Sequence, residues 1–140
     1  MLPLVVTAGL TWTSTSTDLF ARRASDATVV SAADLEREYG IRVNLVAVTA
    51  DGGLVDLRFT VVDRDKAGHV LHEAAELPQL LLPDSGAVLR APQPRAHKLD
   101  LVNGASYFLL YPNSGGLVQA GASVSVVIDE IRLEPVLARS

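Results

Sequence analysis

Two neighbouring runs of alternating apolar and polar residues constrain the fold of this chain more than any other feature. In the first run Ile41, Val43 and Leu45 share one predicted face, and Asp51-Gly52-Gly53 then supplies a turn. The second run places apolar side chains at every other position: Val55, Leu57, Phe59 and Val61. Because side chains alternate between the two faces of a strand, this pattern predicts two half-buried strands joined as a β-hairpin.

Helical signals flank the hairpin. The stretch SAADLEREYG offers Ser31 as the N-cap, Asp34 three residues later, and Gly40 as the stop, which predicts a helix of two to three turns. After the hairpin, DRDKAGHVLHEAAELPQ carries apolar residues at helical spacing and predicts a second short helix that ends before Pro78.

The last third of the chain is predicted to be β again. Turn residues at Asn103-Gly104, Ala120-Gly121 and Asp129-Glu130 separate short apolar runs. Counted from residue 41 to residue 137, about seven short strands follow one another at intervals of about 8–12 residues, which is typical of an antiparallel sandwich. We therefore expect a mostly-β fold with two short helices.

The chain has the length of one domain. Its 140 residues are 49% hydrophobic and 20% charged, a globular composition. We assign residues 31–140 to a single domain and residues 1–30 to an N-terminal arm, with a possible strand over Leu4–Trp12 and a Thr/Ser-rich tract after it. The apolar run from Leu2 to Leu10 lacks the basic region and the cleavage site of a clear signal peptide, and it is too short for a membrane-spanning helix.

Two segments, IRVNLVAVTADGGLVDLRFTVVD and AGASVSVVIDEIRLEPV, resemble the strands of bacterial immunoglobulin-like β-sandwich domains. The resemblance covers residues 41–137 and rests on strand rhythm. It implies an immunoglobulin-like sandwich and, since many such domains are extracytoplasmic, a place outside the cytoplasm. It transfers no functional residues, because the paired cysteines are absent and the single tryptophan, Trp12, lies in the arm.

Composition and motifs exclude several functions. A net charge of −4 with scattered Lys and Arg leaves no basic stripe, so we expect no nucleic-acid binding. The absence of cysteine removes thiol nucleophiles and Zn–thiolate sites. Neither a phosphate-binding loop nor a G-x-S-x-G motif occurs, so we expect no cofactor and no enzymatic activity.

One stripe of the second predicted helix has the chemistry of a metal site. On a helix, Asp65, His69, His72 and Glu76 fall on one face, and carboxylate and imidazole groups can hold Zn²⁺ or Cu²⁺. The same stripe lies opposite the apolar face, as the solvated side of an amphipathic helix would. A small metal- or ligand-binding domain is therefore the alternative function. The other interpretation of the stripe is that it is only the solvent-exposed side of an amphipathic helix.

The leading functional hypothesis is a non-enzymatic interaction or assembly module, an accessory subunit of a larger complex with a protein partner or a second copy. The arm, through Leu4, Val6 and Trp12, is expected to pair with a sheet edge. Tyr107 and Tyr111 share one face of a predicted strand and Phe108 and Leu110 the other. The tyrosine face is the candidate interaction surface, although a run this apolar favours burial of both faces.

Overall fold

The computed structural model describes residues 22–71, 77–92 and 100–140 and shows a mostly-β fold with short helices. Residues 22–26 are also helical, and two 3-10 turns, η1 Ala50–Gly52 and η2 Ser114–Gly116, lie in loops. The principal elements in chain order are β1 Thr28–Val30, α2 Ala32–Tyr39, β2 Ile41–Thr49, β3 Leu54–Val61, α3 Arg64–Leu71, β4 Gln79–Leu81, β5 Val88–Arg90, β6 Ser106–Pro112, β7 Ser123–Ile128, β8 Ile131–Leu133 and β9 Val136–Leu137.

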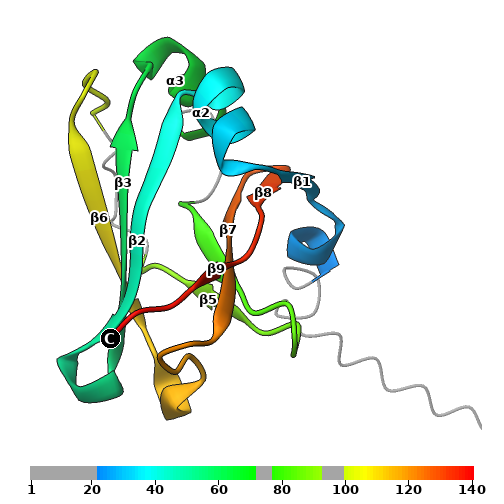
Figure 1. Cartoon of the computed structure of the whole chain (residues 1–140), viewed down its shortest axis with the longest axis vertical. Helices are drawn as coiled ribbons and strands as arrows, with labels where there is room; N and C mark the ends of the chain where they lie inside the picture. Colours follow the sequence, from blue (N-terminus) through cyan, green and yellow to red (C-terminus); the bar gives the residue numbers. More distant parts are fainter. Residues whose placement is uncertain (1–21, 72–76, 93–99) are drawn as a thin grey trace, which may run out of the picture.

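The strands form two sheets that share one core (Figure 1). The larger sheet has the order β1-β8-β7-β4-β5, with β9 also paired to β7, and the smaller sheet has the order β2-β3-β6. All pairs are antiparallel except β1 with β8, which is parallel. The mostly-β class is confirmed. Within the described part of the chain, eight strands rather than about seven lie between residues 41 and 137, and the immunoglobulin-like arrangement stays a prediction.

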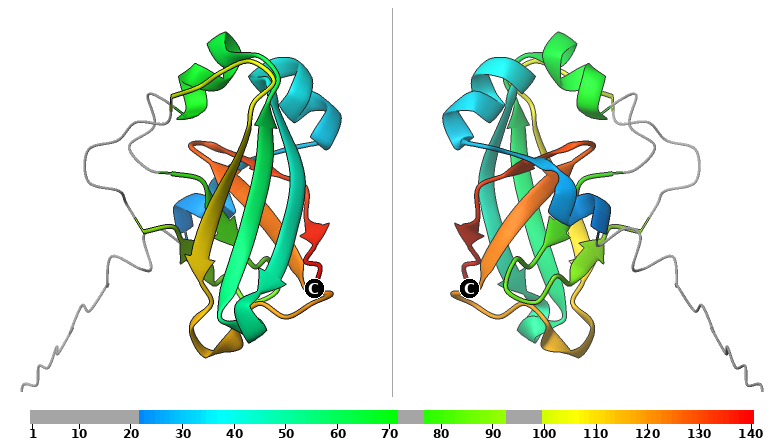
Figure 2. Two further views of the ribbon diagram at one scale, coloured as in Figure 1. Left: turned by 90° about the vertical axis from the view of Figure 1, so that its left-hand side faces the viewer. Right: turned by 90° about the vertical axis from the view of Figure 1, so that its right-hand side faces the viewer.

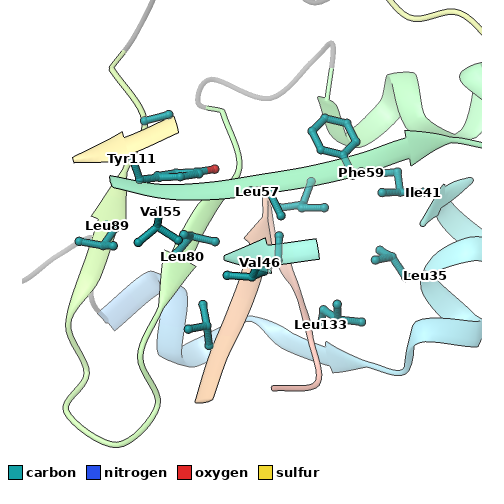
Figure 3. Close-up of a cluster of buried hydrophobic side chains, with 14 of the residues drawn as sticks. Leu35, Ile41, Val46, Val55, Leu57, Phe59, Leu80, Leu89, Tyr111 and Leu133 are labelled. Atoms are coloured by element: carbon teal, nitrogen blue, oxygen red, sulfur yellow. The ribbon is translucent and has the colours of Figure 1, made fainter. Parts of the chain in front are cut away.

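The β2–β3 hairpin forms as the alternation predicts. Its inward face on β3 consists of four side chains that are at most 2% exposed: Val55, Leu57, Phe59 and Val61. Figure 3 shows Val55 and Leu57 in one cluster with Leu80 and Leu133 of the larger sheet and Leu35 of α2. The core therefore lies between the two sheets, with α2 closing one end.

A β-bulge corrects one detail of the predicted hairpin. The register shifts between Val43 and Leu45, so that Leu45 lies opposite Arg58 on the outer face. Val46, which is 3% exposed, occupies the core position that the alternation assigned to Leu45. An extra residue in one strand reverses the phase of every side chain beyond it, and a simple alternation count does not detect this.

Helix α2 begins and ends at the predicted caps. The Ser31 side chain accepts a hydrogen bond of 3.1 Å from the backbone N–H of Asp34. Gly40 ends the helix in the left-handed conformation, with φ of 64°, and its N–H donates to the Glu36 carbonyl at 3.0 Å. The helix thereby directs Leu35, 1% exposed, into the core.

The described end of the predicted arm belongs to the larger sheet. Ala24 in the helical turn 22–26 packs with Leu81 and Val127 on the sheet face that points away from the shared core. Strand β1 then pairs with β8 at the sheet edge, so residues 22–30 cover and extend this sheet (Figure 2). Residues 1–21 lie outside the described residues.

A charge at Phe59 should unfold the protein, whereas the same change at Phe108 should not. Phe59 is 2% exposed and Phe108 is 66% exposed, so only Phe59→Asp places a carboxylate in the core. We expect Phe59→Asp to remove more than about 4 kcal/mol of stability, and Phe108→Asp to change it by no more than about 0.5 kcal/mol. Urea unfolding followed by circular dichroism measures both, and equal effects would show that the sheet faces are assigned incorrectly.

Gly40 is expected to be the most sensitive glycine among those described. A Cβ there would lie 2.5 Å from the Asp63 carbonyl oxygen, and φ is +64°. Gly52 has a φ of +89° but meets nothing within 4 Å. Gly52→Ala should therefore lower the free energy of unfolding only by the backbone strain, about 1 kcal/mol. Gly40→Ala should lower it by at least twice that amount. Comparing the two unfolding midpoints checks this, and a smaller loss for Gly40→Ala would contradict it.

Candidate functional site

The two faces of strand β6 differ in exposure, and its alternation determines the candidate site. Tyr107 and Tyr111 point toward the core and Phe108 and Leu110 point away from it. Tyr111 is 0% exposed, so the expectation that it presents its ring to a partner is wrong. The reason lies in the pairing: Tyr111 and Tyr107 stand opposite Val55 and Phe59, whose side chains enter the core.

Both tyrosines have defined partners. The Tyr111 hydroxyl donates to the Pro78 carbonyl at 2.6 Å, and burial raises the pKa of Tyr111 well above its usual value. Tyr107 stacks on Phe59 with ring centroids 5.6 Å apart. Its hydroxyl donates to the Asp100 carbonyl at 2.7 Å and accepts from the Val102 N–H at 2.8 Å. These bonds fix β6 and the segment before it against the core.

Phe108 and Leu110 form the exposed apolar part of the smaller sheet. They are 66% and 40% exposed, so no described residue covers this face of β6, and the interpretation that the arm covers it stays a prediction. The left view of Figure 2 looks onto the sheet face that carries them. We call this surface the β6 face and define it by Phe108 and Leu110 together with their cross-strand neighbours Arg58 and Asp56.

An ion pair borders the two apolar side chains. Arg58 lies opposite Phe108, and its Nε atom is 2.9 Å from Oδ2 of Asp56, which lies opposite Leu110. The Asp56 side chain is only 10% exposed, and its Oδ1 has no hydrogen-bond partner among the described residues. A nearly buried carboxylate on an outward strand face departs from the polar, solvated face that the alternation predicts. Leu110 and Ala47, the strand neighbours of Asp56, flank it on both sides.

A row of polar side chains crosses the sheet next to the ion pair. The Asn44 amide donates to the Thr60 hydroxyl at 2.7 Å, and the Thr60 and Ser106 hydroxyl oxygens lie 2.9 Å apart. The row links β2, β3 and β6 on the outer surface. The β6 face is thus held rigidly by cross-strand bonds, with aromatic and arginine side chains presented beside a polar border, a composition enriched in protein interfaces.

The predicted metal stripe is only partly within the described residues. Asp65 and His69 lie on the exposed face of α3, with the Asp65 side chain 93% exposed, while Ala67, Val70 and Leu71 on the opposite side are buried. His72 and Glu76 lie outside the described residues. Over 22–71, 77–92 and 100–140, no three His, Cys, Asp or Glu side chains are grouped as metal ligands. The metal site stays a prediction.

The arm residues Leu4, Val6 and Trp12, which were expected to contact a partner, also lie outside the described residues. Of the five residues expected in the interaction surface, Tyr107 and Tyr111 are therefore the ones that the structure describes, and both face inward. Phe108 and Leu110, which the same alternation placed on the opposite face, are the exposed pair. The alternation in the sequence assigned the two pairs of side chains to opposite faces of β6, but it did not determine which face would be buried in the core.

Comparisons with known proteins add no relative to this picture. No family model matches the chain, and neither a curated protein nor a solved structure matches it. In the part of the chain that the structure describes, no helix has the length and apolar character needed to cross a membrane.

The buried hydroxyl of Tyr111 predicts a loss of stability in alkali. Its folded-state pKa is raised, whereas an unfolded tyrosine titrates near about pH 10. The neutral hydroxyl therefore stabilises the fold fully below about pH 10, and this contribution decreases as the pH rises further, because only the unfolded chain can then ionise. Tyr111→Phe should cost about 1 kcal/mol at pH 8 through the lost hydrogen bond and should lose less stability than the wild type between pH 8 and pH 11.

The matched control is Tyr39→Phe, at a half-buried ring on α2. It keeps Tyr111 and should keep the wild-type dependence on pH. Guanidinium unfolding at both pH values measures the three proteins, and an unchanged slope in Tyr111→Phe would contradict the assignment.

Proposed function

We propose that this chain is a non-enzymatic interaction module, an accessory subunit of a larger assembly, and that it binds a protein partner through the β6 face. The observation that carries the proposal is the exposure of Phe108, at 66%, on a sheet whose backbone and polar side chains are held in place. A large apolar side chain on a rigid surface loses little conformational freedom on binding, which favours affinity.

The charges beside Phe108 support a protein partner. Arg58 forms an ion pair with the nearly buried Asp56 and lies opposite Phe108 on the neighbouring strand. Of its side chain, 59% is exposed. Aromatic residues and arginine are the side chains most enriched at energetically important interface positions. Covering the pair would also strengthen it, since water screens it less at an interface.

The size of the face indicates the strength of the contact. Seven residues of β6 and three strands correspond to a surface of about 24 Å by about 14 Å, from the usual rise and spacing of strands. A stable interface buries about 800 Å² on each partner, which is more than a face of these dimensions offers. The β6 face alone therefore fits a transient contact, or one part of a contact that includes further surfaces.

The immunoglobulin-like architecture and a place outside the cytoplasm belong to the same proposal. Two facing, mainly antiparallel sheets around a shared core support the former. The latter rests on the resemblance of the strand segments to extracytoplasmic domains. Neither is required for the β6 face to bind a partner.

Replacing Phe108 should weaken association without unfolding the protein. We expect Phe108→Ser to reduce affinity for the partner, or self-association where the partner is a second copy, by more than about tenfold. Native mass spectrometry and sedimentation velocity on the full chain, with its copurifying proteins, measure this. Leu117→Ser is the matched control, because Leu117 is a 52% exposed apolar residue outside the β6 face.

Two results would contradict the proposal. One is a chain that remains monomeric and partner-free at high concentration and after chemical crosslinking. The other is an equal loss of association in Phe108→Ser and Leu117→Ser.

A further inference from the structure

Strand β6 forms one edge of the smaller sheet, and this edge carries none of the features that keep sheets from pairing with one another. The left view of Figure 2 shows β6 at the side of the sheet, next to β3. Natural edge strands are protected by short length, by charges, by bulges or by a covering segment. Strand β6 has seven residues and pairs with β3 without a bulge, and residues 106–111 carry no charge.

The other sheet edges of the described chain are protected. Strands β1 and β5 have three residues each, and β5 ends in Arg90. The free edge of β2 is interrupted by the bulge after Val43, and beyond the bulge its backbone bonds to Arg139. Among the described strands, β6 is therefore the edge best suited to accept a further strand.

The backbone of β6 bonds alternately to β3 and to the open edge. The Asn113 N–H donates to the Gly53 carbonyl at 2.9 Å, directly beyond the end of the strand. Since consecutive residues of an antiparallel strand direct their backbone groups to opposite edges, the odd-numbered residues of β6 bond to β3. The backbone groups of Ser106, Phe108 and Leu110 therefore point to the open edge, where no strand of the described chain pairs with them.

We propose that β6 pairs in antiparallel orientation with β6 of a second copy of this chain, so that the two smaller sheets join into one continuous sheet. The inference rests on the function proposed above, because Phe108 and Leu110 also define the β6 face, and it names the partner. A two-fold axis brings the same strand from each copy into contact. The nearest charges, Arg58 and Asp56, already pair with each other, so the two copies bring no unpaired charge of like sign together along β6.

Pro112 and Gly104 determine the register of this pairing. With Phe108 opposite Phe108 of the second copy, Ser106 lies opposite Leu110, and each N–H at the open edge meets a carbonyl. A shift of two residues in one direction would place Ser106 opposite Pro112, which has no N–H. A shift in the other direction would place Leu110 opposite Gly104, whose N–H already bonds to β3. The favoured register also places the two Phe108 rings side by side on the outer surface, as a cross-strand aromatic pair.

The dimensions of the contact indicate a reversible dimer. The edge of a seven-residue strand is about 24 Å long, and one sheet layer is about 10 Å thick. The area is well below the about 800 Å² on each partner that a stable interface buries. We therefore expect a dissociation constant in the micromolar range.

A proline at the open edge tests the pairing. Leu110→Pro removes an N–H that points to the second copy and leaves the bonds to β3 intact. Two bonds are lost for each dimer because of the two-fold symmetry, so the dissociation constant should rise by more than about tenfold. Leu110→Thr is the matched control, since it removes the same leucine but keeps the N–H, and it should raise the constant by less than about threefold. Sedimentation equilibrium of the purified full chain measures both, with circular dichroism to show that the variants are folded.

The register can be tested without proline because the chain contains no cysteine. In the proposed pairing the Cα atoms of Ser106 in one copy and Leu110 in the other lie about 5.5 Å apart, within the range that a disulfide spans. Two copies of the same residue, Ser106 or Leu110, lie about 13 Å apart, which is too far. A mixture of Ser106→Cys and Leu110→Cys should therefore form a disulfide-linked dimer on oxidation with copper phenanthroline, and either variant alone should not. Non-reducing gel electrophoresis separates the products.

Four results would overturn the inference, and they distinguish it from the proposed function. A chain that stays monomeric but loses a different copurifying protein in Phe108→Ser would keep the β6 face and exclude the second copy as its partner. A dimer weakened by Phe108→Ser and unchanged in folded Leu110→Pro would form through the face and not through the edge. Equal crosslinking in the mixture and in the single variants would contradict the register. A dimer unchanged in all these variants would remove both proposals.

Discussion

Burial of one face of β3 is the constraint on which the rest of the structure depends. Val55, Leu57, Phe59 and Val61 contribute to the shared core from the central strand of the smaller sheet, so both of its neighbours must match their phase. On one side β2 achieves this with a bulge, and on the other side β6 turns its tyrosines inward. The exposed position of Phe108 follows from that requirement, because the side chain next to an inward one on a strand must point outward.

The larger sheet differs from the smaller one because both of its faces are buried at β7. Strand β7 is buried on both faces, with Val124 and Val126 toward the shared core and Val127 under Ala24. A sheet buried on both sides needs a second cover, and the helical turn 22–26 provides it. The smaller sheet lacks such a cover in the described residues, and its outer surface is held by polar side chains and an ion pair instead. The asymmetry between the two sheets explains why the candidate contact surface lies on the smaller one.

Local signals could be predicted from the sequence, and long-range pairings could not. The hairpin turn, the cap at Ser31 and the stop at Gly40 depend on residues within a few positions of one another, and all three are confirmed. The facing of β6 depends on its pairing with β3, with Thr60 and Ser106 46 positions apart, and alternation alone leaves two equivalent choices. The parallel joining of β1 to β8 spans most of the chain. The burial of Asp56 was missed for the same reason, since Leu110 flanks it only after β6 has paired.

The bulge at Asn44 also determines how this hairpin tolerates changes of length. Before it, Ile41 and Val43 face the core, and after it Val46 takes over, so the two halves of β2 are out of phase by one residue. Removing Asn44 or Leu45 would restore a regular ladder with every core side chain still inward, whereas removing one of the inward residues Val43 or Val46 would place a polar or outward residue in the core position. The bulge is therefore the place in β2 where the strand can lose one residue and keep its core face intact.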